Sequence, residues 1–406
     1  MLVTAKPEDV GLSSERLERI GPWMDSYIEA GKLPGGLALV ARHGQVVYCQ
    51  CRGLRDVEAG LPVEEDTIFR FYSMTKPITS IAVMMLYEEG RFQLDNPIAA
   101  FLPEFADMQV YVSGEGAAMR TEPARGPITF RHLLTHTGGL TYGFFEATPV
   151  DAAYRENKVE FNGGKGDLAA CARRLADQPL LNHPGDEWNY SVSTDLLGRL
   201  VEVISGQPLD EFLQRRILGP LGMEDTAFSI LPGKQNRFAA NYGPEEGGGL
   251  ELIDSARESK YRDVILFSGG GGLTSTARDY HRFTQMLRGK GELEGVRLLG
   301  RKTVEYMTTN HLPDNGDLTS MGQAVFSETS YDGVGFGLGF SVMLDPAKAQ
   351  VIGSPGEYAW GGAASTAFWI DPVEDMSVIF LTQLMPSSTY PLRRELKVLT
   401  YQALID

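Results

Sequence analysis

The sequence predicts an α/β (α+β) fold in which both ends of the chain build one antiparallel sheet, flanked by helices, and a mainly helical region is inserted between them. Three observations predict it: β-forming segments lie near both termini, a helical segment accompanies each group of strands, and the long middle is mostly helical in pattern. We expect an α/β domain of residues 1–72 and 330–406 and a mainly helical region of residues 73–329 that carries active-site loops.

The N-terminal elements are a helix and a hairpin. In residues 12–31 apolar side chains recur at helical spacing between a serine N-cap and a glycine stop. Residues 37–42 and 45–51 are rich in β-forming side chains, and the dipeptide His43-Gly44 between them suits a tight turn. We therefore expect one long helix followed by two paired strands.

The C-terminal elements mirror this order. Residues 365–370 and 376–384 are predicted as strands joined through Asp371-Pro372, and residues 392–404 as a helix. The segments between the two ends show helical periodicity, at residues 74–89, 129–135, 168–177, 194–204, 209–217 and 277–287. Helices thus dominate the middle of the chain.

Charge and composition exclude some classes of partner. The formal net charge is −16, from 53 acidic and 37 basic residues, and no basic run is present, so nucleic acid is not an expected partner. The first thirty residues carry scattered acidic side chains, and no stretch is apolar enough to span a bilayer. We expect a soluble, cytoplasmic protein that does not bind membranes.

The chain has three cysteines, and two of them, Cys49 and Cys51, lie two apart on one predicted strand. Side chains at that spacing point to one face and are badly placed to bridge each other. The pair also lacks the two-residue gap of redox and zinc motifs. We expect reduced thiols in the core.

Ser73 and Lys76 form the sharpest local motif, Ser-x-x-Lys, where an extended segment runs into a long amphipathic helix. Residues three apart share a helical face, so the Lys76 ammonium comes within reach of the Ser73 hydroxyl. The positive end of the helix dipole also favours a developing alkoxide. The spacing therefore indicates a serine nucleophile, although an N-cap serine beside a solvated lysine would give the same four residues.

Tyr190 lies just before another helical segment and is framed by a tight turn at Pro184-Gly185. A tyrosine ionises only at high pH in water, so a role as base requires a nearby ammonium such as that of Lys76. Tyr190 is thus a candidate base for Ser73, against the alternative of a packing tyrosine.

A third element is Trp360-Gly361-Gly362-Ala363, which leads into a predicted strand. Two glycines permit close approach of a ligand to the backbone. The Ala363 N–H at this strand end, opposite the Ser73 N–H, would make a two-donor oxyanion hole. The alternative is a glycine-rich turn beside a packed tryptophan.

In this order and at these separations, the three elements resemble the class C β-lactamase and family VIII carboxylesterase group of penicillin-recognising serine hydrolases. Supporting segments lie at residues 133–140, 184–191 and 271–279. The resemblance covers nearly the whole chain and implies a β-lactamase/transpeptidase-like fold. It also implies that Tyr190, supported by Lys76, deprotonates Ser73 to form an acyl-enzyme that water hydrolyses. Which of Lys76 and Tyr190 is the base stays open.

Two departures from the β-lactamase pattern concern the substrate. The β-lactamases place a lysine where this chain has Trp360, and an asparagine where it has Val192. Both changes remove polar groups suited to a charged amide, and Trp-Gly-Gly resembles the esterase branch. We therefore expect hydrolysis of small, neutral, short-to-medium acyl esters, in a pocket that Trp360, Gly361, Gly362 and Val192 help to line. Tyr142, Phe144 and the segments around Gly247 and Asp314 are further candidates for its lining.

Other classes of function remain as alternatives. A β-lactamase or D-amino-acid peptidase, a short-amide hydrolase and an acyltransferase share the same first half-reaction, and an inactive scaffold would keep only the fold. The chain lacks the Gly-x-Ser-x-Gly elbow of α/β-hydrolases, and neither His136 nor His183 has a triad pattern. His132 and His136 have metal spacing but no third ligand, so we expect no metal and no cofactor. The oligomeric state is left open.

Overall fold

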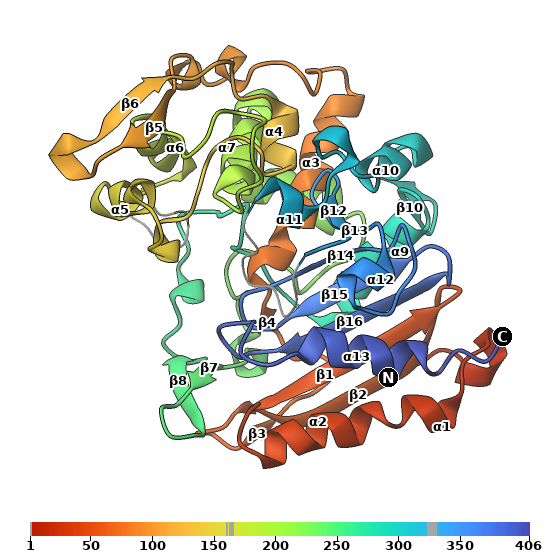
Figure 1. The fold of residues 1–406 in the computed structure, drawn as a ribbon. Coiled ribbons are helices and arrows are strands. Elements are labelled where there is room, and N and C mark those ends of the chain that lie inside the picture. The colour runs from red at the N-terminus through yellow and green to blue at the C-terminus, as the bar shows by residue number, and fades with distance from the viewer. Residues whose placement is uncertain (1, 160, 162–165, 323–330) are drawn as a thin grey trace.

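An eight-stranded antiparallel sheet forms the base of the molecule in the computed structural model (Figure 1). The structure describes residues 2–159, 161, 166–322 and 331–406. The strand order is β12-β13-β14-β15-β16-β1-β2-β3, so that C-terminal β16 (Met376–Thr382) pairs with N-terminal β1 (Gly35–Arg42). The prediction of one antiparallel sheet built from both ends of the chain is confirmed.

The other strands of this sheet are β2 (Gln45–Asp56), β3 (Leu61–Pro62), β12 (Val334–Phe336), β13 (Ser341–Met343), β14 (Tyr358–Gly361) and β15 (Ala367–Asp371). Short two-stranded sheets pair β4 (Phe69–Arg70) with β9 (Thr274–Ser275), β5 (Gln109–Ser113) with β6 (Arg120–Pro123), β7 (Asn241–Pro244) with β8 (Leu250–Asp254) and β10 (Glu292–Leu293) with β11 (Val296–Arg297). The helices are α1 (Ser14–Leu17), α2 (Ile20–Glu29), α3 (Thr75–Glu88), α4 (Phe130–Leu134), α5 (Pro149–Glu156), α6 (Leu168–Ala176), α7 (Ser193–Ser205), α8 (Leu209–Leu213), α9 (Ala277–Arg288), α10 (Arg301–Met307), α11 (Leu318–Met321), α12 (Pro346–Ala349) and α13 (Leu392–Tyr401).

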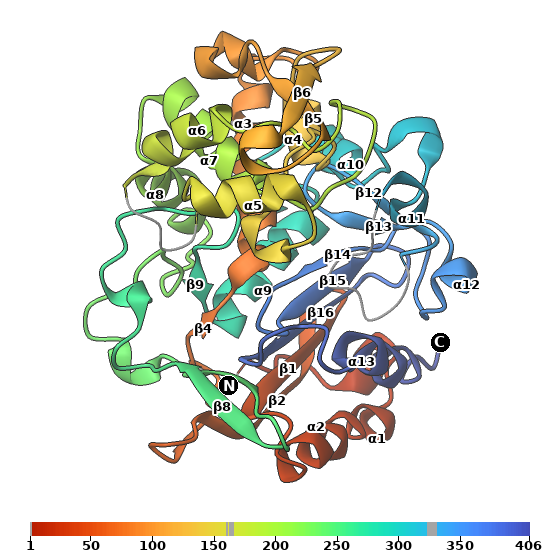
Figure 2. The same ribbon diagram turned by 60° about the vertical axis from the view of Figure 1, so that its left-hand side comes forward.

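The two faces of the sheet bury different cores. Leu37 and Leu39 of β1 join a large apolar core with α3, α7 and α9, whereas the alternate residues Ala38 and Val40 join a second core with α2 and α13. Figure 2 shows α1, α2 and α13 on one side of the sheet and α3 and α9 on the other. The sheet thus lies between the layer of terminal helices and the helical region.

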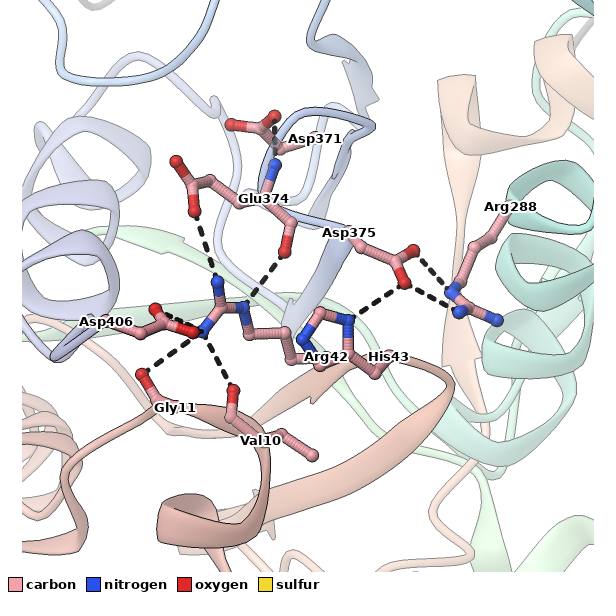
Figure 3. Close-up of polar contacts among 9 residues, drawn as sticks. All are labelled: Val10, Gly11, Arg42, His43, Arg288, Asp371, Glu374, Asp375 and Asp406. Atoms are coloured by element: carbon pink, nitrogen blue, oxygen red, sulfur yellow. Dashed lines mark hydrogen bonds and ion pairs between the residues drawn. The ribbon is translucent and has the colours of Figure 1, made fainter.

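Two hairpin turns at one end of the sheet are held together by charged groups (Figure 3). His43 and Gly44 form the β1–β2 turn with φ of 51° and 78°, as a tight primed turn requires. Asp375, in the β15–β16 turn, contacts His43 Nδ1 at 3.0 Å and the Arg288 guanidinium at 2.6 and 2.7 Å. Arg42 donates to Asp406 over 2.8 Å, so this end of the sheet ties together both ends of the chain.

Some sequence expectations need correction. The helix predicted over residues 12–31 is two helices, α1 and α2, because Pro22 has no N–H to donate to the carbonyl of residue 18. The second domain boundary, between residues 329 and 330, lies outside the described residues, and the domain division stays a prediction. Within the described ranges, no helix is both long and apolar enough to cross a membrane.

Cys49 and Cys51 are free thiols, as expected, and lie half-buried against the larger core on β2. Burial raises the pKa of each thiol to about 12. Both thiols are therefore neutral and unreactive near neutral pH.

Candidate active site

Ser73 lies in a short 3₁₀ turn, Tyr72–Met74, that leads directly into α3. The segment before it is anchored along residues 273–275: β4 pairs with β9, and the Phe71 N–H donates to the Leu273 carbonyl over 3.0 Å. Thr75 Oγ1 in turn accepts from the Leu273 N–H over 3.1 Å. The segment over residues 271–279, which supported the resemblance, therefore holds the nucleophile turn in place.

Tyr72, immediately before Ser73, has a positive φ of 43°, which is costly for a residue with a side chain. Its phenol accepts from Asn241 Nδ2 over 3.2 Å, and burial raises its pKa to about 12. Strained backbone next to a nucleophile is a feature of functional sites. Sequence reasoning missed this residue, because a tyrosine gives no signal for a left-handed conformation.

Lys76 is buried, with 2% of its surface exposed, and its ammonium has three acceptors. It donates to Ser73 Oγ over 3.1 Å, to the Tyr142 hydroxyl over 3.0 Å and to the Gly270 carbonyl over 2.7 Å. These contacts match the three donor protons of an ammonium. The solvated-lysine alternative is thereby excluded, and the lysine lies against the serine as the helical spacing predicts.

Tyr190 completes the cluster around the serine, because its hydroxyl donates to Ser73 Oγ over 2.5 Å. The Lys76 ammonium lies 4.5 Å from the centre of the Tyr190 ring, within the range of a cation–π interaction. The ring also packs against His136, Trp188 and Trp360, at centroid distances of 5.1, 6.2 and 5.5 Å. Tyr190, 117 residues from Ser73 in the sequence, is thus brought together with Ser73 and Lys76.

Backbone hydrogen bonds from the loop after α4 hold the segment that carries Tyr190. The Asn189 N–H donates to the His136 carbonyl and the Gly185 N–H to the Thr137 carbonyl, each over 2.8 Å. The Val192 N–H donates to the Thr141 carbonyl over 3.3 Å. Residues 133–140 therefore have a structural role, which accounts for their place in the resemblance.

Asp195, on α7, is a buried carboxylate behind Lys76 that sequence reasoning missed. It accepts from Ser268 Oγ over 2.5 Å and from the Gly270 N–H over 2.9 Å, while the carbonyl of Gly270 accepts from Lys76. Burial raises the pKa of Asp195, and the Lys76 charge opposes that shift. The glycine run at residues 269–272 thus links a carboxylate to the ammonium through Gly270.

Tyr142 also contacts Lys76, but it differs from Tyr190 in its surroundings. Burial, followed by the nearby Asp195 and Tyr190, raises the pKa of Tyr142 well above its ordinary value. Its side chain is therefore a neutral phenol that accepts from the ammonium. The sequence marked Tyr142 as a pocket residue and gave no signal for this contact.

The glycine motif lies opposite the nucleophile turn, at the end of β14. β13 pairs with β14 only as far as Ala359, so among the described residues no strand pairs with Trp360 on that side. A Cβ atom added to Gly362 would overlap the Phe71 carbonyl oxygen. Gly362 is therefore required by the close approach of this loop to the segment that carries Ser73.

A cavity of about 750 Å³ opens above these groups. All predicted site residues except the buried Lys76 line it, namely Ser73, Tyr142, Phe144, Tyr190, Val192, Trp360, Gly361, Gly362 and Ala363. Phe144 stacks on Tyr142 with a centroid distance of 4.6 Å. The segments around Gly247 and Asp314 were also expected to line the cavity, and this expectation is wrong, because neither is among its lining residues. Gly247 lies in the β7–β8 turn, and Asp314 lies in a separate 3₁₀ turn.

The histidines do not form a competing catalytic site. His136 Nδ1 contacts Ser191 Oγ at 3.1 Å, but both residues are buried, with at most 1% of their surface exposed. Burial and then the Lys76 charge lower the pKa of His136 well below its ordinary value. His183 contacts Glu122 near the surface. In the part of the chain that the structure describes, no group of histidine, cysteine or carboxylate side chains has the arrangement of a metal site.

Comparisons with known proteins agree with this geometry. The family model Beta-lactamase matches residues 22–402. Esterase EstB of Burkholderia gladioli is 33% identical, over 93% of this chain and 92% of that protein. Among solved structures, EstCE1, described as a hydrolase with promiscuous acyltransferase activity, superposes with a TM-score of 0.80 at 26% identity over 95% and 99% of the chains. Simvastatin synthase (LovD) from Aspergillus terreus superposes with a TM-score of 0.79 at 26% identity over 97% and 98%.

Proposed function

The chain belongs to the Beta-lactamase family, and on that premise we propose that it is a serine carboxylesterase that hydrolyses small, neutral, short-to-medium acyl esters through an acyl-enzyme on Ser73. One observation carries the proposal. Ser73 Oγ lies 2.5 Å from the Tyr190 hydroxyl and 3.1 Å from the Lys76 ammonium, at the wall of a cavity. A nucleophile in contact with both a base and a fixed cation is the arrangement that acyl transfer needs.

In the acylation step, Tyr190 reacts as the phenolate, after its own proton has passed to solvent, and takes the Ser73 proton as Ser73 Oγ attacks the ester carbonyl carbon. The Lys76 ammonium lies 3.1 Å from Ser73 Oγ and 4.5 Å from the centre of the Tyr190 ring, so it stabilises negative charge on either side chain. When the tetrahedral intermediate collapses, the bond to the alcohol oxygen breaks and Tyr190 returns the proton to the leaving alkoxide. The products of this half-reaction are the alcohol and the acyl-enzyme.

In the deacylation step, Tyr190 takes a proton from water as the water oxygen attacks the acyl carbon. The bond to Ser73 Oγ then breaks, Ser73 regains the proton and the acid leaves. In both steps the negative oxygen of the intermediate accepts from the N–H groups of Ser73 and Ala363. Both residues line the cavity, which supports this oxyanion hole.

The substrate class follows from the cavity near the serine. Tyr142, Phe144, Trp188 and Trp360 form an aromatic wall, and Val192 is apolar where the β-lactamases carry an amide. The indole N–H of Trp360 is buried and has no acceptor among the described residues. Such a wall favours neutral, apolar esters over charged amides. A cytoplasmic location stays a proposal that rests on the sequence alone.

A second candidate activity is transfer of the acyl group to an alcohol. It is favoured by the size of the cavity, which exceeds what a short acyl ester fills, and by the likeness to LovD and EstCE1. The acyl-enzyme is the same, and only the deacylating nucleophile differs. Adding butanol to the assay distinguishes the two, because a transferase forms the butyl ester faster than the free acid.

The test of the function uses p-nitrophenyl acetate, butyrate and octanoate beside nitrocefin, with the wild type and Ser73→Ala under identical conditions. We expect ester cleavage that is lost in Ser73→Ala, with little or no turnover of nitrocefin. Strong turnover of nitrocefin would overturn the substrate class. Ester cleavage that survives in Ser73→Ala would overturn the site.

A further inference from the structure

The connection between β14 and β15 that carries Ala363 is a hairpin loop with a tight turn at residues 362–365. The Gly362 N–H donates to the Thr366 carbonyl over 2.9 Å, and the Ser365 N–H donates back to the Gly362 carbonyl over 3.1 Å. Ser365 has a φ of 64°, the left-handed position that ends such a loop. Ala363 is the second residue of the turn, so its N–H takes no part in the turn's own hydrogen bonds. The fold thereby leaves one amide for another acceptor.

Arg393, in the first turn of α13, contacts the backbone of this loop. Its Nη2 donates to the Gly362 carbonyl over 3.0 Å and to the Thr366 carbonyl over 3.1 Å. The guanidinium reaches them across Gly361, where an added Cβ would lie 2.6 Å from Arg393 Cζ. Gly361 therefore leaves the space that the Arg393 guanidinium occupies.

The Gly362 carbonyl and the Ala363 N–H belong to one peptide unit. In a trans peptide these two groups point in opposite directions, so a donor that fixes the carbonyl also fixes where the N–H points. A cation on the carbonyl oxygen further polarises the peptide and makes its N–H a stronger donor. Arg393 thus acts on the amide that is proposed to bind the developing oxyanion.

We propose that Arg393 is a positioning residue for the oxyanion hole, which orients and polarises the Gly362–Ala363 peptide without contacting the substrate. This inference rests on the proposed function, because it concerns the intermediate formed on Ser73. Since Arg393 also lines the cavity, direct binding of a substrate group is the competing role. The two roles differ in kinetics: a positioning residue changes kcat and the binding of a tetrahedral analogue, whereas a substrate contact changes KM.

The experiment compares Arg393→Gln and Arg393→Lys with the matched control Arg394→Gln, which removes the same charge from the exposed neighbouring position of α13. The substrate is p-nitrophenyl butyrate, and phenylboronic acid is the tetrahedral analogue. We expect Arg393→Gln to lower kcat about 10- to 100-fold and to weaken boronate inhibition by a similar factor, with KM changed by less than about threefold. Arg393→Lys keeps a donor and should lose less, and Arg394→Gln should match the wild type.

Two results would overturn the inference: kcat and boronate inhibition both within about twofold of the wild type in Arg393→Gln, or a loss carried by KM alone. If Arg393→Gln does not fold, Arg393→Lys decides by the same two readouts. A wild type without Ser73-dependent esterase activity would remove the proposed function itself. An active wild type with a fully active Arg393→Gln would remove only the role of Arg393.

Discussion

On one side of the cavity, Lys76 donates to Ser73, Tyr142 and Gly270, and Tyr190 also donates to Ser73, so this side is held by functional groups. On the other side, Ala363 contributes only its backbone, and its place depends on a turn and on two glycines that leave room for their neighbours. The first side is therefore sensitive to the loss of a functional group, and the second to added volume. This difference orders the expected effects of substitution.

The largest contrast is expected between the two tyrosines on the nucleophile side. Tyr190→Phe removes the hydroxyl that contacts Ser73, and we expect kcat to fall by about 10²- to 10⁴-fold. Tyr142→Phe is the matched control: it removes only one acceptor of Lys76, so the loss should stay below about tenfold. Steady-state kinetics on p-nitrophenyl butyrate measure both. Equal losses in the two variants would contradict the assignment of Tyr190.

On the oxyanion side, the addition of a single methyl group should be enough to lower kcat. Gly362→Ala places a Cβ against the Phe71 carbonyl oxygen, and we expect displacement of the loop to lower kcat about 10- to 100-fold. Gly126→Ala is the control, because a Cβ at Gly126 would meet no atom within 4 Å. The same assay with a thermal melt separates loss of activity from loss of folding. A fully active Gly362→Ala would show that the loop does not depend on this close approach.

Asp195→Asn probes the charge behind Lys76. The amide keeps an oxygen for Ser268 and the Gly270 N–H but removes the negative charge that faces the ammonium. We expect kcat to fall about tenfold, which corresponds to ~1.4 kcal/mol. Kinetics together with a thermal melt measure the effect. An unchanged kcat in a folded variant would limit Asp195 to a packing role.

The smallest effect is expected far from the cavity, at the two joined hairpin turns (Figure 3). Burial alone would raise the pKa of Asp375, but its contacts with Arg288 and His43 outweigh burial and lower it. A lowered pKa means that this contribution to the free energy of unfolding is present above the ordinary aspartate range and is lost as the pH falls below it. Arg288→Gln should cost about 0.5–1 kcal/mol at pH 7, as expected for a partly exposed pair.

Urea unfolding of Arg288→Gln and the wild type at pH 7 and in strong acid measures that difference. The difference in the free energy of unfolding between the two proteins should shrink at low pH, while esterase activity at pH 7 stays unchanged. If this difference did not change with pH, the stabilisation would be assigned to packing of the arginine side chain.

The parts of the site that the sequence predicts are those with a local signal. Ser73 and Lys76 lie one helical turn apart, so periodicity alone predicts their contact, and the hairpin at His43-Gly44 follows from its turn residues. The paired ends of the sheet follow from β-forming segments near both termini. These features depend on neighbours in the sequence or on the order of elements.

The missed features are contacts between distant segments. Gly270 accepts from Lys76 across 194 residues of sequence, and Asp195 and Arg393 each contact a distant peptide group. Backbone acceptors leave no residue-type signal, because any residue carries a carbonyl. Tyr190 lies between these cases: its turn is readable and marks it as a candidate base, but no local pattern predicts a contact with Ser73 across 117 residues of sequence.

The central claim is that Ser73 carries the acyl group. Rapid acid quenching of the wild type with p-nitrophenyl butyrate, followed by mass spectrometry of the digested protein, tests it directly. We predict one butyryl group on the peptide that contains Ser73, and none on that peptide in Ser73→Ala. A butyryl group on another residue, or steady ester hydrolysis by Ser73→Ala, would contradict the account.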